Sequence, residues 1–102
     1  MARVRRIRSA SMRGKEYRIR WKRPPPVMTP DGRPQLVDGM CQAPLSKNPE
    51  IWIAPDLPTI RMMWALLHES GHACMWDIDE EAVDETAESQ TALLIRAGFT
   101  LV

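Results

Sequence analysis

The sequence predicts an α+β fold within a single domain. Two stretches have the pattern of β-strands, an alternating segment around Tyr17 and the short apolar run Ile51–Ile53, and two helical patterns follow them in the second half. A chain of 102 residues has room for one compact domain, and an apolar content of 44% argues against disorder.

Basic side chains are concentrated at the N-terminus. Residues 1–23 hold ten of the 14 Lys and Arg residues and one acid, whereas residues 77–88 hold seven acids and no base. Residues 1–14 have few apolar positions, and we interpret them as a basic N-terminal arm, either loose or a weak edge strand, ahead of a single domain at residues 15–102. Such segregation is typical of a solvated face; contact between residues 1–23 and nucleic acid is the alternative.

An alternating segment from Glu16 to Lys22 predicts the first clear strand. Apolar residues on one side and charged residues on the other are typical of a half-buried strand, and the apolar set is Tyr17, Ile19 and Trp21. Three prolines from Pro24 end it, because proline cannot donate to a sheet ladder. Residues 24–49 are expected to be mostly loop, with a short strand within Gln35–Cys41. Ile51–Ile53, bounded by prolines, predicts the second clear strand.

The first helix is expected from about Leu57 to Met75. Asp56 can cap it, and Pro58 suits its first turn, where a missing N–H costs nothing. The helix is apolar on nearly all sides, so it should be buried against more than one neighbour. Trp64 and Trp76 are expected in the core rather than as walls for a substrate.

The second helix is expected from Glu80 to Ala97, with Asp79 as its N-cap and Gly98 in the C′ position that ends a helix. At about 100° per residue, one broad face should pack on the first helix. The members of that face are Ala82, Val83, Thr86, Ala87, Gln90, Leu93, Leu94 and Ala97. Glu81 and Glu88 point away from it and should be solvated.

One segment of the first helix carries chemistry, because residues 68–72 read His-Glu-Ser-Gly-His, the HExxH pattern. Side chains four apart on a helix lie on one face, so His68 and His72, the only histidines in the chain, can bind one ion. With a third protein ligand, zinc keeps a fourth position for water, and Glu69 can take a proton from that water. Two ordinary buried histidines, one of them paired with a carboxylate, are the alternative.

The third zinc ligand is expected among the acids that follow the motif. Orientation favours Glu80, which lies closest to the apolar face of the second helix, whereas two straight antiparallel helices would bring Glu85 to the height of the metal. Residues 75–79 between the helices are expected to be irregular, so the direction in which a side chain leaves the second helix is given more weight than its position along that helix. Glu80 is therefore the predicted ligand and Glu85 the alternative, with Asp79 expected to be a cap.

The motif segment Leu66–Ala73, with the strand before it and the acid-rich helix after it, resembles the zincin metallopeptidases. It is most similar to small, often phage-associated members akin to the ImmA/IrrE and SprT-like groups. The resemblance covers about residues 50–98 and implies a minimal zincin core, in which a short twisted sheet packs on the HExxH helix and a second, C-terminal helix. It also implies that Ile51–Ile53 is an edge strand that aligns a peptide, with Trp52 and Ile53 as substrate-binding residues.

These observations predict a zinc metallopeptidase in which Glu69 acts as general base on a polypeptide substrate. The alternative is a catalytically weak or inactive metal-binding scaffold, whose basic N-terminal arm binds nucleic acid or another protein. A hydrolase acting on a non-peptide bond is a third, less favoured reading.

No apolar run approaches the ~20 residues of a membrane span, and no hydrophobic stretch follows the arginine-rich N-terminus as in a secretory signal. Cys41 and Cys74 are too few for a disulfide scaffold and are expected to be buried thiols. The sequence therefore predicts a cytoplasmic protein without membrane contact, in the host cytoplasm if a phage encodes it.

Overall fold

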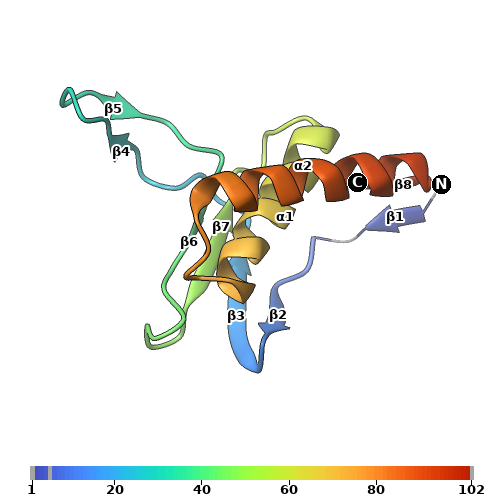
Figure 1. The fold of residues 1–102 in the computed structure, drawn as a ribbon, viewed down its shortest axis with the longest axis horizontal. Coiled ribbons are helices and arrows are strands. Elements are labelled where there is room, and N and C mark those ends of the chain that lie inside the picture. Colours follow the sequence, from blue (N-terminus) through green and yellow to red (C-terminus); the bar gives the residue numbers. More distant parts are fainter. Residues whose placement is uncertain (1, 5, 102) are drawn as a thin grey trace.

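Four strands form a mixed sheet that carries both helices on one side (Figure 1). The structure is a computed structural model that describes residues 2–4 and 6–101; residues 1, 5 and 102, which belong to the expected arm and to the end of the domain, lie outside the described residues. The α+β class is confirmed. The elements are β1 (Ala2–Val4), β2 (Ser9–Met12), β3 (Lys15–Arg20), β4 (Val27–Met28), β5 (Pro34–Gln35), β6 (Gly39–Cys41), β7 (Glu50–Ile53), α1 (Thr59–Cys74), α2 (Glu80–Arg96) and β8 (Phe99–Leu101).

The strand order in the main sheet is β2-β3-β7-β6. β3 pairs antiparallel with β2 and parallel with β7, and β6 pairs antiparallel with β7. Both expected strands are therefore confirmed, but the expectation that Ile51–Ile53 forms an edge strand is wrong. Met40 of β6 lies opposite Trp52 in the ladder, so β6 is the edge and β7 is interior.

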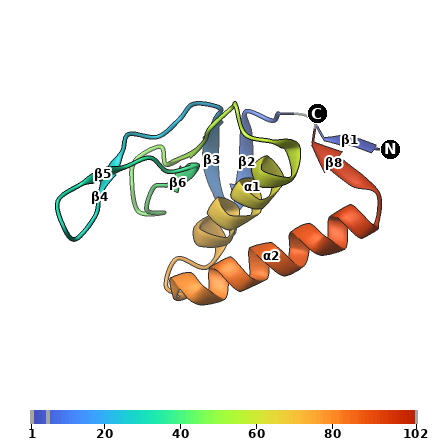
Figure 2. The same cartoon turned by 90° about the horizontal axis from the view of Figure 1, so that it is seen from above.

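The described N-terminal residues include two strands, β1 and β2. The arm was expected to be either loose or a weak edge strand, and the second expectation holds for the part that forms these strands. β2 joins β3 through a tight turn at Arg13 and Gly14, which have φ values of 51° and 79°. β1 pairs in parallel with β8 in a separate two-stranded sheet beyond the end of α2 (Figure 2).

The loop region expected at residues 24–49 holds more strand than predicted. β4 and β5 form a short hairpin that projects from the body of the molecule (Figure 1). The single strand expected within Gln35–Cys41 is divided, because residues 36–38 separate β5 from β6.

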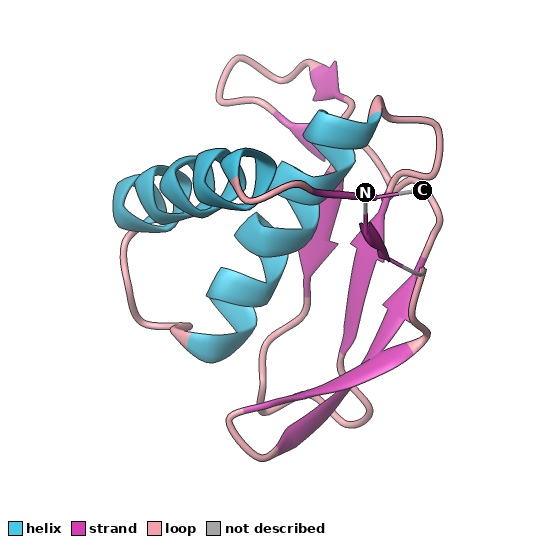
Figure 3. Ribbon diagram, turned by 90° about the vertical axis from the view of Figure 1, so that its right-hand side faces the viewer, coloured by secondary structure: helices cyan, strands magenta, loops and turns pink. Residues whose placement is uncertain are grey.

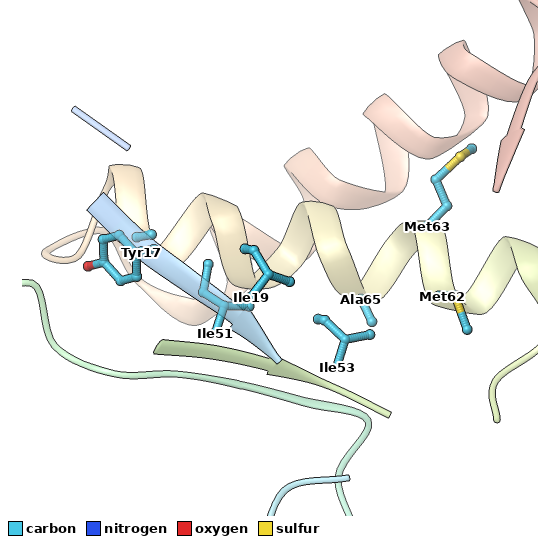
Figure 4. Packing of buried hydrophobic residues seen from close by; sticks show 8 residues of the cluster. Tyr17, Ile19, Ile51, Ile53, Met62, Met63 and Ala65 are labelled. Atoms are coloured by element: carbon cyan, nitrogen blue, oxygen red, sulfur yellow. The ribbon is translucent and has the colours of Figure 1, made fainter. Parts of the chain in front are cut away.

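α1 lies between the sheet and α2 (Figure 3), which confirms that it is buried against more than one neighbour. It packs Met62 and Ala65 on the side that faces β3 and β7, whereas Met63, a member of the same buried cluster, points away from these strands (Figure 4). The strand side chains in this core are Tyr17, Ile19, Ile51 and Ile53, and each fully buried isoleucine contributes about 1.5–3 kcal/mol. Neither helix of the described chain is long and apolar enough to cross a membrane.

The expected N-cap of α1 is wrong. The helix begins at Thr59, two residues later than predicted, and the residue before it is Pro58, which makes no side-chain capping bond. Asp56 lies too early in the chain to reach the first turn, because a cap must directly precede the helix. Its carboxylate instead accepts a hydrogen bond from the Arg23 guanidinium at 3.0 Å.

Both ends of α2 are as predicted. The Asp79 carboxylate accepts a hydrogen bond from the Ala82 N–H at 2.8 Å, and Gly98 follows the helix with a φ of 91°. The buried face differs from the expected one: Val83 and Ala87 are buried as predicted, Thr91 is buried although it was not expected there, and Leu93 is 67% exposed. Glu81 and Glu88 are exposed, as predicted.

Candidate metal centre

The side chains of His68, His72 and Glu80 converge at one point between the two helices. The Nε2 atoms of the two histidines, one turn apart on α1, are 3.1 Å from each other. The Glu80 carboxylate lies across them, with Oε1 at 2.9 Å from Nε2 of His68 and Oε2 at 2.9 Å from Nε2 of His72. Glu80 is the first residue of α2, so the third group comes from the start of the second helix.

The chain between the helices folds back, and this explains why Glu80 reaches the histidines. The Met75 N–H donates to the Gly71 carbonyl, and the Ile78 N–H donates to the Met75 carbonyl, so the connection is a tight turn. α2 also approaches α1 closely at Gly71, where an added Cβ would lie 3.2 Å from Cγ1 of Val83. Glu85, the alternative ligand, is exposed and does not line the cleft beside the histidines.

Asp84 also contacts this group, although the sequence did not single it out. Its Oδ1 atom lies 2.8 Å from Nδ1 of His68, but not in hydrogen-bond alignment with the ring. A carboxylate at the second ring nitrogen of a metal-binding histidine orients the ring and makes it a better ligand. The signal in the sequence was the spacing, because Glu80 and Asp84 are four apart on one helix, as His68 and His72 are on the other.

The donor groups are close enough to one another to share one metal ion. Tetrahedral ligands at 2.0–2.1 Å from zinc lie about 3.3 Å from one another; here the two Nε2 atoms are 3.1 Å apart, and each lies 2.9 Å from a different oxygen of Glu80. Two imidazoles and one carboxylate also form a ligand set that is typical of catalytic zinc, which keeps one position open. His68, His72 and Glu80 are thus suited to hold the ion, with Asp84 behind His68.

Glu69 lies on the sheet side of the histidines and is only 8% exposed. Burial, with smaller contributions from the negative charges of Glu80 and Asp84, raises the pKa of its carboxyl to about 8. The space for this side chain depends on Gly39 of β6, where an added Cβ would come within 2.9 Å of both Cγ and Oε2 of Glu69. A residue other than glycine at position 39 would therefore displace the carboxylate.

A cleft of about 470 Å³ opens over these groups. One wall is the segment 35–39 that leads into β6, and Arg61 and Trp64 of α1 form part of another. The predicted substrate-binding residues lie elsewhere. Ile53 is fully buried in the core, and Trp52 alternates with it, so its side chain is on the face of the sheet opposite α1. The wall before β6 was missed because residues 24–49 were expected to be mostly loop, with no residue of that segment singled out for a site.

The rings of Trp64 and Trp76 lie at either end of a row of four aromatic rings, with His68 and His72 between them. The Trp64 ring centroid is 4.7 Å from that of His68, and the half-buried indole both packs against the core and lines the cleft. Trp76 is 6.5 Å from His72, between ring centroids, and is 47% exposed, so the expectation that it belongs to the core is wrong. It follows the end of α1, in the turn that connects the two helices.

Comparisons of the chain with protein-family models, with curated proteins and with solved structures gave no match. The resemblance to zincins therefore stays a prediction that rests on the HExxH residues.

Proposed function

We propose that this chain is a zinc-dependent peptidase. The observation that supports the proposal most directly is the convergence of His68, His72 and Glu80 within 2.9–3.1 Å, with the buried Glu69 beside them at the base of a cleft. Buried histidines without a metal could also pair with a carboxylate, but here one carboxylate spans two Nε2 atoms that lie only 3.1 Å apart, as donors to one ion would.

The division of labour follows from the positions of the four side chains. His68, His72 and Glu80 would hold the zinc ion, which when bound polarises a carbonyl and lowers the pKa of water. Glu69 would be the general base: the positive charge of the bound ion would offset the effect of burial on its pKa, so that its carboxylate could take the proton of the attacking water and then give it to the leaving amine. Asp84 lies 2.8 Å from Nδ1 of His68 and, once aligned to accept its proton, would hold that ring in place.

A polypeptide is the substrate class that the cleft fits best. β6 forms the edge of the main sheet directly beside Glu69, and an edge strand presents backbone groups to which an extended peptide can pair. Segment 35–39, which leads into this edge, forms the wall of the cleft. The peptide would thus lie along β6 rather than along β7.

We also infer a cytoplasmic location. Cys41 and Cys74 are both free and partly buried, and unpaired thiols are typical of a reducing compartment.

The test uses Glu69→Gln and, as a matched control, Glu81→Gln, which makes the same chemical change at an exposed site on α2. Elemental analysis of protein purified without added metal should give about one zinc per chain for the parent and both variants. Cleavage of a fluorescently labelled unfolded protein should disappear in Glu69→Gln and persist in Glu81→Gln. Unchanged cleavage by Glu69→Gln would end the proposal.

A further inference from the structure

The face of the main sheet opposite α1, here called the outer sheet face, is not packed against any helix or strand among the described elements (Figure 3). Side chains that lie opposite each other in a ladder share a face. Arg20 lies opposite Trp52, and Arg18 lies opposite Glu50 and Ser9. The side chains of β3 and β7 among these alternate with buried ones, and Ser9 is exposed, so together they form a surface open to solvent.

Positive charge dominates the outer sheet face and the strand end beside it. Arg18, Arg20 and Lys22 follow one another at every second position, and the Arg18 side chain is 70% exposed. Two adjoining hollows of about 500 Å³ lie along this region and share Arg8 and Arg18. The acids in these hollows are Glu16 and Glu50, so the cations are in excess.

Trp52 is held in place at the centre of this surface. Its Nε1 donates a hydrogen bond of 2.9 Å to Oε1 of Glu50, and the Arg20 guanidinium lies 3.4 Å from the other oxygen of that carboxylate. The charged groups of Arg20 and Lys22 lie 5.5 Å and 5.7 Å from the Trp52 ring centroid. Within the described chain, Lys22 has no carboxylate at ion-pair distance, so its charge is free for an outside anion.

We infer that the outer sheet face binds single-stranded nucleic acid, with phosphates on Arg18, Arg20 and Lys22 and a base stacked on Trp52. Spaced cations around a fixed aromatic ring match the alternation of phosphates and bases along a strand. A duplex keeps its bases stacked on each other and could use only the cations. The surface contains none of the candidate zinc-binding residues, so the inference does not depend on the proposed peptidase activity.

The test measures fluorescence anisotropy of a labelled oligothymidine of about 15 nucleotides, with a duplex of equal length for comparison. The single strand should bind more tightly than the duplex. With three phosphates neutralised, its affinity should fall roughly 20-fold between about 50 and 200 mM salt. Trp52→Ala should weaken binding about tenfold or more, whereas Trp52→Phe, which keeps a ring for stacking, should retain most of it. Binding should also quench tryptophan fluorescence less in Trp52→Phe than in the parent.

Charge is tested with Arg18→Glu against Arg96→Glu, which makes the same change at an exposed position in the last turn of α2. Arg18→Glu should weaken binding and lower the salt dependence, and Arg96→Glu should do neither. Thermal unfolding checks that each variant is folded. If Trp52→Ala is not folded, the comparison of Arg18→Glu with Arg96→Glu tests the inference in its place. No binding at about 50 mM salt, equal binding of the duplex, or equal effects of the two Arg variants would overturn the inference.

Discussion

The helix side and the sheet side of this molecule arrange their charged groups in different ways. On the helix side, the two ring nitrogens of His68 each contact a carboxylate oxygen, that of Glu80 at 2.9 Å and that of Asp84 at 2.8 Å, beside the buried Glu69. On the sheet side, Arg18 and Arg20 are spread along a strand and contact Glu50 at 3.9 Å and 3.4 Å. A crossing of two helices is needed for the first arrangement, whereas the ladder register alone is sufficient for the second.

This difference has a practical meaning for substitutions. Converging groups that share one ion depend on each other, so loss of one donor affects the whole site. Spread charges act nearly independently and are screened by salt. Variants on the helix side should therefore have large, specific effects on metal content, and matched variants on the sheet side should not.

The largest expected effect is the loss of zinc from Glu80→Ala. Removal of a direct ligand should lower the zinc content at least about tenfold, since loss of a group behind a ligand already costs 10–100-fold in affinity. Glu85→Ala, the same change one turn further along α2, should leave the content near the parent value, because Glu85 does not reach the histidines. Elemental analysis after dialysis measures both. Near-full occupancy in Glu80→Ala would remove this residue from the ligand set.

A sharper form of the comparison exchanges one carboxylate for an amide on each side. Asp84→Asn takes the charge from Nδ1 of His68 and should weaken zinc binding about 10–100-fold in competition with a coloured chelator. Glu50→Gln removes a carboxylate from the Trp52 ring N–H on the sheet side and should leave zinc binding unchanged. Equal effects of the two variants would mean that general charge, and not orientation of the ring, sets the affinity.

The last comparison concerns Cys41, on the inner face of β6, and is read from thiol reactivity instead of metal content. Burial, followed by the negative charge of Glu69, raises the pKa of its thiol to about 12. In Cys74→Ala protein, iodoacetamide at pH 9 should therefore modify Cys41 about a hundredfold faster after unfolding in urea. Because the pKa is higher in the folded state, the contribution of this thiol to stability is complete below the unfolded pKa of about 8.5 and is lost as the pH rises toward 12.

The matched control for this experiment is a cysteine on the open side of the sheet. Ser9→Cys, in protein that lacks both natural cysteines, should react at nearly the same rate folded and unfolded, since Ser9 is exposed. If Cys41 in the folded protein reacts as fast as the cysteine at position 9, the two faces of the sheet do not differ in solvent access as described.

Local sequence patterns predicted the two clear strands, both ends of α2 and the position of the HExxH residues on a helix. These features depend on periodicity and on capping residues such as Asp79 and Gly98, which act over a few positions. The order of strands could not be predicted in the same way, because β6 is short and lies in a proline-rich segment without clear alternation. For that reason Ile51–Ile53 was expected at an edge that β6 occupies.

The acids around the histidines also show how far local sequence patterns can predict a site. Helix orientation pointed to Glu80, whose carboxylate contacts both histidines, while the contact of Asp84 with His68 depends on how the two helices cross. That crossing is set by the close approach of Val83 to Gly71 and by the tight turn after α1, and neither distance can be obtained from a helical wheel.

Gly39 links the two parts of the proposed reaction. Its backbone belongs to the edge strand that would receive a peptide, and the missing side chain leaves room for Glu69. A peptide that paired with β6 would stiffen the strand against which this carboxylate rests, and so arrival of the substrate would itself steady the group that handles the proton. An empty edge would leave the same group less constrained, so the proposed activity would depend on a peptide that pairs with β6.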